Sequence, residues 1–186
     1  MFNIFIMGPS QSGKTTIAKQ VGIALSMPVI SASDWVRNTF VADFPVITAE
    51  DKMRFIGAIT EYSTNQLRKD PNMCLKYIRQ HNPKVETERG YILEGFRSPR
   101  DFLSLFNPTT DLAVYLDYYN NPVWGMPFEY EGLKAISYSL VWLVRSHLMT
   151  NRQLLTFTID SLNDIGNVAS ELTNSAGIWF QECPVV

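Results

Sequence analysis

The sequence predicts an α/β fold in which a five-stranded parallel sheet is covered by helices on both faces. Short, nearly continuous apolar runs such as Phe2–Met7 are typical of strands that are buried on both faces. Segments with apolar residues at helical spacing alternate with these runs. A glycine-rich stretch follows the first run directly, and polar residues follow the others. In open parallel sheets the strands end at one shared edge, so we expect these residues to meet there.

The predicted strands share short length and large apolar side chains. They are Phe2–Met7, Pro28–Ile30, Tyr91–Leu93, Leu112–Leu116 and Leu154–Ile159. Ile178–Gln181 has a similar composition and is expected to form an edge strand.

Capping signals mark the starts of the predicted helices. Ser31–Asp34, Thr48–Asp51 and Ser161–Asp164 each have the spacing of a capping box. Asp70 is a helix cap that precedes Pro71 at the first helical position. The predicted helices cover residues 16–26, 31–40, 48–67, 71–81, 98–106 and 133–149, and a last helix begins at residue 161.

Length and composition point to a single domain over residues 1–186. The chain is 46% hydrophobic, which allows a large core. A net charge of −2 argues against a nucleic-acid partner, which usually requires a basic field. Cys74 and Cys183 are too few for a zinc site, and no apolar run is long enough to cross a membrane. We therefore expect a cytoplasmic protein, compatible with a homodimer, that binds a small molecule.

Two stretches break the strand–helix rhythm, at about residues 31–90 and 118–150. Excursions of this kind often carry binding residues on an α/β scaffold. We expect the first to be a helical acceptor-binding insertion and the second to be a lid-like segment.

The stretch Gly8–Thr15, GPSQSGKT, fits the phosphate-binding pattern G-x-x-x-x-G-K-[ST] without a mismatch. Its glycines let backbone N–H groups point at phosphate oxygens, and the Lys14 ammonium can reach the β- and γ-phosphates. The Thr15 hydroxyl is a hard oxygen that suits Mg²⁺. ATP and Mg²⁺ are therefore the predicted cofactors. The predicted nucleotide-binding residues are Gly8, Ser10, Gln11, Ser12, Gly13, Lys14, Thr15 and Thr16.

Beyond this loop, Ser31–Arg37 (SASDWVR), Tyr91–Arg97 (YILEGFR) and Leu112–Asp117 follow in an order that resembles the nucleoside monophosphate kinases. Adenylate kinase and phage-type deoxynucleoside monophosphate kinases are examples. The resemblance implies a three-layer P-loop NTPase fold with strand order 2-3-1-4-5. It also implies phosphoryl transfer from ATP to a nucleoside or deoxynucleoside monophosphate.

The resemblance further implies roles for single residues. Asp34 and Arg37 would face the acceptor, and Glu94 would hold Mg²⁺ through water. Arg97 or Arg100 would bind phosphate. The predicted catalytic residues are Lys14, Asp34, Glu94 and Arg97; the predicted substrate-binding residues are Asp34, Arg37, Arg97, Arg100 and Arg145; and the predicted metal-binding residues are Thr15, Glu94 and Asp117.

Alternatives remain open from the sequence. An equally good interpretation of Asp34 is that it is only the capping partner of Ser31. Asp117 follows a buried strand and is the rival metal ligand to Glu94. Residues 120–131 lack the lid arginines of adenylate kinases, which leaves Arg145 and Arg152 as candidates to replace them. The acceptor could be another small metabolite, or the protein could be a nucleotide-gated binding protein with little turnover.

Overall fold

The centre of the molecule is a five-stranded sheet with the strand order β2-β3-β1-β4-β5. The structure is a computed structural model that describes residues 2–9, 11–44, 55–70, 72–81, 90–96, 102–103, 105–118, 120 and 154–182. All four strand pairs are parallel. The parallel sheet and its strand order are therefore confirmed. The strands are β1 (Ile4–Met7), β2 (Val29–Ser31), β3 (Ile92–Glu94), β4 (Leu112–Asp117) and β5 (Leu154–Thr158).

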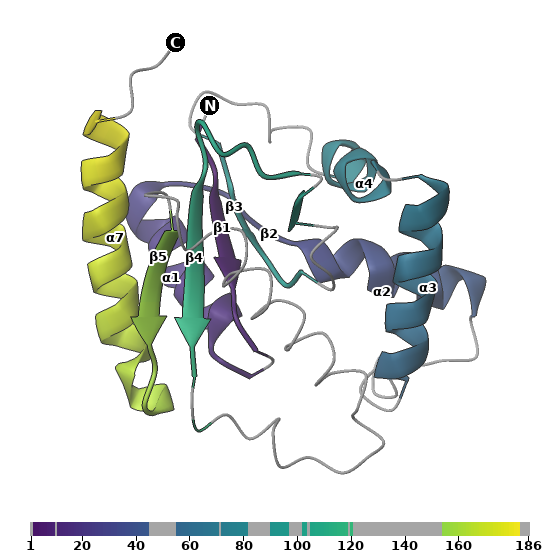
Figure 1. Cartoon of the computed structure of the whole chain (residues 1–186), viewed down its shortest axis with the longest axis horizontal. Helices are drawn as coiled ribbons and strands as arrows, with labels where there is room; N and C mark the ends of the chain where they lie inside the picture. The colour runs from purple at the N-terminus through teal and green to yellow at the C-terminus, as the bar shows by residue number, and fades with distance from the viewer. Residues whose placement is uncertain are drawn as a thin grey trace.

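Helices cover both faces of this sheet (Figure 1). On one face, α1 (Lys14–Leu25) and α7 (Ile165–Glu182) pack against each other and enclose one apolar core cluster. On the other face, α2 (Ala32–Asp43), α3 (Ile56–Lys69) and α4 (Met73–His81) contribute to a second cluster. Within the described ranges, none of the helices combines the length and apolar character that a membrane span requires.

Two of the predicted helix caps are present in the structure. Ser161 and Asp164 form the predicted capping box at the start of the 3-10 helix η6 (Leu162–Asp164), which leads into α7. Asp70 accepts a hydrogen bond from the Asn72 N–H at 3.0 Å, just before α4. The predicted helix start at Thr48–Asp51 and the predicted helix at 133–149 lie outside the described residues.

Two local predictions are wrong. Ile178–Gln181 is not an edge strand, because it continues α7, whose buried residues Val168, Leu172 and Ala176 belong to the core cluster between this helix, α1 and the sheet. Tertiary packing of these residues overrides the local strand preference. Ser31 does occupy the N-cap position of α2, but its side chain makes no capping hydrogen bond. Its hydroxyl lies instead 3.0 Å from the hydroxyl of Ser33.

At the amino ends of the strands, a buried carboxylate ties β1 to β4. Asp111 is 1% exposed and accepts hydrogen bonds from the Asn3 backbone N–H and the Asn3 side-chain amide, at 3.2 and 3.0 Å. The Asn107 N–H and the Thr110 hydroxyl donate to the same carboxylate at 2.8 and 3.2 Å. The Asn3 amide oxygen accepts from the Tyr91 N–H at 3.2 Å. This network lies at the edge of the sheet opposite to the glycine loop.

The contact between α2 and α3 leads to a first prediction. The Tyr62 hydroxyl on α3 donates a hydrogen bond to Asp43 at the end of α2. Burial, together with this hydrogen bond and the charge of Asp43, raises the pKa of Tyr62 to about 12. We expect Asp43→Asn to lower the pKa of Tyr62 toward 10. Because the pKa is raised in the folded state, the associated stability is present below about pH 10 and is lost as the pH rises through 12.

The measurement is a pH titration of ¹³Cζ-labelled tyrosine followed by NMR, with Tyr62→Phe to assign the resonance. An unchanged Tyr62 midpoint in Asp43→Asn would contradict the prediction.

Candidate active site

The loop between β1 and α1 has a backbone that requires its glycines. Gly8 and Gly13 have φ angles of +152° and +80°, a region that side chains rarely adopt. A Cβ at Gly8 would lie 2.8 Å from the Leu116 carbonyl oxygen. A Cβ at Gly13 would lie 2.6 Å from the side chain of Ile165, the first residue of α7. The described part of the loop therefore curls in the way that the phosphate-binding pattern demands.

Lys14 opens α1 and folds back over the loop. Its ammonium donates a hydrogen bond to the Pro9 carbonyl oxygen and lies 3.5 Å from the Ser12 hydroxyl. Ser12 is fully buried, whereas Thr15 is exposed at the start of the helix. The first turn of α1 carries no acidic residue, so its positive end is not neutralised from within the helix. Backbone N–H groups, the Lys14 ammonium and the Thr15 hydroxyl therefore all lie at the start of α1. Together they form a set of groups that suits a polyphosphate.

The two candidate metal carboxylates point to opposite faces of the sheet. Successive side chains of a strand alternate between the faces. In β3, Ile92 belongs to the α1–α7 cluster and Leu93 to the other one, so Glu94 points to the α1 side. In β4, Leu116 belongs to the α1–α7 cluster, so Asp117 points away from α1. This geometry favours Glu94 as the carboxylate on the side of Lys14.

Glu94 also differs from Asp117 in its burial and neighbours. Glu94 is 4% exposed and pairs in register with Ile6 on β1 and Ser31 on β2. Asp117 is exposed. Among the described residues, no group of three or more His, Cys, Asp or Glu side chains could hold a metal ion. A site here would therefore combine a single carboxylate with a hydroxyl, water and phosphate oxygens, as Mg²⁺ sites often do.

Asp34 and Arg37 lie on the first turns of α2 and form an ion pair with each other. Both side chains are partly exposed, with 47% of Asp34 and 33% of Arg37 accessible. Asp34 is not a capping partner of Ser31. The pair stands directly after β2, at the edge of the sheet where Glu94 ends β3. Its role toward an acceptor stays a prediction.

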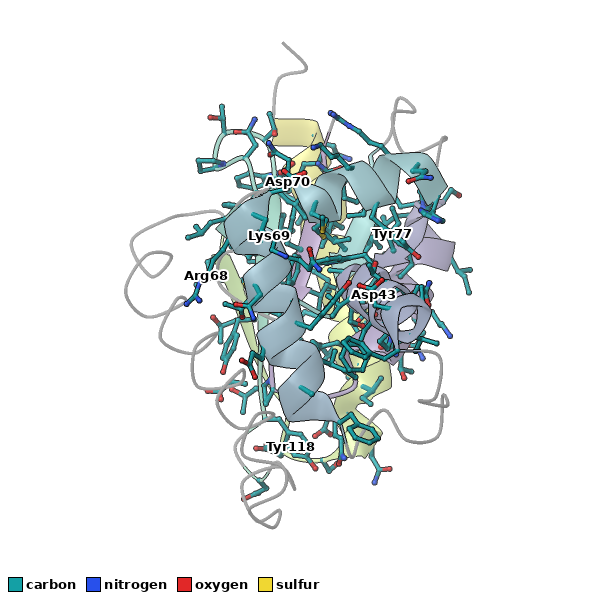
Figure 2. All side chains as sticks on the ribbon, turned by 90° about the vertical axis from the view of Figure 1, so that its right-hand side faces the viewer. Asp43, Arg68, Lys69, Asp70, Tyr77 and Tyr118 are labelled. Carbon is teal, nitrogen blue, oxygen red and sulfur yellow. The ribbon has the colours of Figure 1, made fainter. Side chains whose placement is uncertain are left out.

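Several predicted site residues lie outside the described residues: Ser10, Arg97, Arg100, Arg145 and Arg152. Figure 2 shows that another charged group, Arg68, Lys69 and Asp70, lies at the junction of α3 and α4. Tyr118, which follows β4, lies at the opposite end of the view. The charges at this junction are therefore separate from the site at the strand ends.

Two residues near the site are not apparent from the sequence patterns. Ile165 packs on Gly13, and Ser33 lies next to Gly95, where an added Cβ would be 3.2 Å from the Ser33 hydroxyl. The signal for Ile165 is its place directly after the capping box of residues 161–164. No local pattern indicates the contact of Ser33, because it depends on the pairing of β2 with β3.

The Gly13 geometry gives a second prediction. Gly13→Ala is expected to weaken ATP binding by about tenfold, because it adds a Cβ against Ile165 at a left-handed backbone position. The measurement is calorimetric titration with ATP. The matched control is Gly177→Ala in α7, where an added Cβ meets nothing within 4 Å. That change should leave ATP binding unaltered and raise the free energy of unfolding by about 0.5–1 kcal/mol. Equal ATP affinity in both variants would contradict the prediction.

Comparison with known proteins shows the fold. No protein-family model and no curated protein matches the chain. A sugar kinase from Janibacter sp. HTCC2649 is similar in structure, with 17% identity, a TM-score of 0.52 and coverage of 99% of this chain and 96% of that one. Shikimate kinase from Aquifex aeolicus is 12% identical, with a TM-score of 0.50 and coverages of 94% and 96%.

Dephospho-CoA kinase from Campylobacter jejuni is also similar, at 12% identity and a TM-score of 0.51. The matched region covers 93% of this chain and 96% of that one. Because these likenesses extend over nearly the full length of both chains, they show that the protein has a P-loop kinase-like fold.

Proposed function

We propose that the protein transfers the γ-phosphoryl group of ATP to a small-molecule acceptor. The observation that carries this proposal is the placement of Glu94 on the α1 side of the sheet, the side on which Lys14 and Thr15 open α1. This arrangement provides a phosphate cradle, a cation and one carboxylate at a shared edge. Transfer of a phosphoryl group needs this kind of positioning and charge neutralisation more than it needs a covalent intermediate.

In this proposal the chain's own residues have distinct tasks. The backbone of the loop from Gly8 to Gly13 binds the phosphates, and Lys14 exchanges the Pro9 carbonyl for phosphate oxygens. Thr15 and Glu94 would hold Mg²⁺, Glu94 through water. The metal, when bound, neutralises charge that develops on the transferred group. Arg97, Arg100 and Arg145 are proposed as further cations for the phosphates.

The proposed acceptor is a nucleoside or deoxynucleoside monophosphate. The support is the start of α2 directly after β2, where Asp34 and Arg37 form an ion pair at the sheet edge at which β3 ends in Glu94. A different metabolite is the second candidate. It is favoured by structural neighbours that are named as kinases of sugar, shikimate and dephospho-CoA.

The test is incubation with Mg²⁺, ATP and a panel of ribo- and deoxyribonucleoside monophosphates, with products followed by ³¹P NMR. Lys14→Ala, purified in parallel, controls for contaminating kinases from the host. We expect a diphosphate product from the wild type alone. Product formed only with a sugar, hydroxy acid or cofactor precursor would select the second candidate. ATP binding without any product would favour a nucleotide-gated binding protein.

A further inference from the structure

Two serine hydroxyls lie together at the carboxyl end of β2. The Ser31 and Ser33 hydroxyl oxygens are 3.0 Å apart, within hydrogen-bond distance. Ser33 is 5% exposed, and Ser31 is half-buried. The pair lies outside the phosphate-binding pattern of residues 8–15. Helix capping does not explain it either, because the Ser31 side chain makes no capping hydrogen bond.

The pair lies against the backbone that follows Glu94. Ser31 and Glu94 are register partners in the β2–β3 ladder. Gly95 has a φ angle of +78°, and a Cβ added there would lie 2.9 Å from the Ser31 hydroxyl and 3.2 Å from that of Ser33. The hydroxyl pair therefore occupies the space directly beside Gly95.

The residue after Gly95, Phe96, is also fixed by packing. Phe96 is 4% exposed and stacks on Phe5 of β1, with the ring centroids 5.7 Å apart. It also meets Phe102 edge to face at 5.6 Å. By contrast, no described residue donates a hydrogen bond to the Glu94 carboxylate. The backbone of residues 94–95, from which that carboxylate projects, therefore lies between the packed Phe96 ring and the serine pair.

We propose that the Ser31–Ser33 hydroxyl pair is a positioning element for the Glu94 carboxylate. The hydrogen bond between the two hydroxyls, formed in the space beside Gly95, fixes the turn from which Glu94 projects toward the α1 side. Ser31 and Ser33 themselves touch neither nucleotide nor metal in this proposal. The inference rests on the proposed function, because the carboxylate that it positions is the proposed partner of Mg²⁺. Partners behind a metal-binding group commonly change metal affinity or activity by about 10- to 100-fold when they are removed.

The test compares Ser31→Thr with Ser31→Val, which share one shape and differ in the hydroxyl. Two readouts are needed: the affinity for Mn²⁺ in the complex with a non-hydrolysable ATP analogue, measured by EPR, and the Mg²⁺ dependence of kcat. We expect Ser31→Val to weaken Mn²⁺ binding by about tenfold and to raise the Mg²⁺ concentration for half-maximal kcat similarly. Ser31→Thr should stay within about twofold of the wild type, and the KM for ATP should stay unchanged in both.

Ser33→Ala removes the other hydroxyl with a smaller change of shape, so it tests the pair if Ser31→Val fails to fold. We expect Ser33→Ala to match Ser31→Val, and the double variant to be no worse than either, because both changes break one interaction. Equal Mn²⁺ affinity in the Thr and Val variants, or normal affinity in Ser33→Ala, would overturn the proposal. The EPR readout needs no turnover. If the wild type makes no product with any acceptor, the proposed function fails, while Mn²⁺ binding still decides on the pair.

Discussion

Glu94→Gln is expected to lower kcat by about 10²- to 10³-fold and to change the KM for ATP by less than about threefold. Removal of one preorganised electrostatic group from a transition state has this order of effect. Glutamine keeps the size of the side chain and removes only its charge. Glu94 is 4% exposed and lies on the α1 side of the sheet, the side on which Lys14 opens α1. A fall in kcat without a rise in KM indicates loss of transition-state stabilisation rather than of ATP binding.

Asp117→Asn provides the discriminating comparison for Glu94→Gln. Asp117 is exposed and points away from α1, so its amide variant should change kcat by less than about threefold. Steady-state rates at saturating ATP and Mg²⁺ and thermal unfolding curves should be recorded for both variants. A large loss in Asp117→Asn together with a small one in Glu94→Gln would move the metal role to Asp117.

The sheet was predictable because its strands are short apolar runs that are easy to recognise in the sequence. Strands that are buried on both faces, such as Ile4–Met7 and Leu112–Asp117, are almost entirely apolar, and the glycine loop marks where the first one ends. The loop itself was predictable because its pattern reflects a strict backbone requirement, visible here in the positive φ angle of Gly13. The strand order came from resemblance, since no local pattern encodes which strands are neighbours.

The details of the site depend on contacts between segments that are distant in the sequence. Sequence patterns do not reveal such contacts. The sequence spacing predicts a capping hydrogen bond from the Ser31 side chain, but in the structure its hydroxyl is paired with the hydroxyl of Ser33. The choice between Glu94 and Asp117 depends on which core cluster each neighbouring strand residue joins. Ile165 reaches Gly13 only because α7 packs beside α1.

Asp111→Ala is expected to lower the free energy of unfolding by about 3 kcal/mol, because buried donors left without an acceptor each cost about 1–3 kcal/mol. The carboxylate is 1% exposed and accepts from Asn3, Asn107 and Thr110. For a chain of this size the melting temperature should fall by roughly 6–12 °C. Urea unfolding followed by circular dichroism measures the change. The matched control is Thr110→Val, which removes one donor and should cost no more than about 1 kcal/mol.

The pH dependence separates the charge of Asp111 from its hydrogen bonds. Burial raises the pKa of Asp111, and the donated hydrogen bonds offset this only in part. The folded state therefore binds the proton more tightly than the unfolded state, and this contribution to stability is lost as the pH rises from about 4 through the raised pKa. Asp111→Asn cannot titrate, and its amide would face the N–H of Asn107. The wild type should be more stable than Asp111→Asn at every pH from 4 to 7, by a margin that narrows as the pH rises. A margin that widens with pH would show that the buried carboxylate is held mainly by its donors.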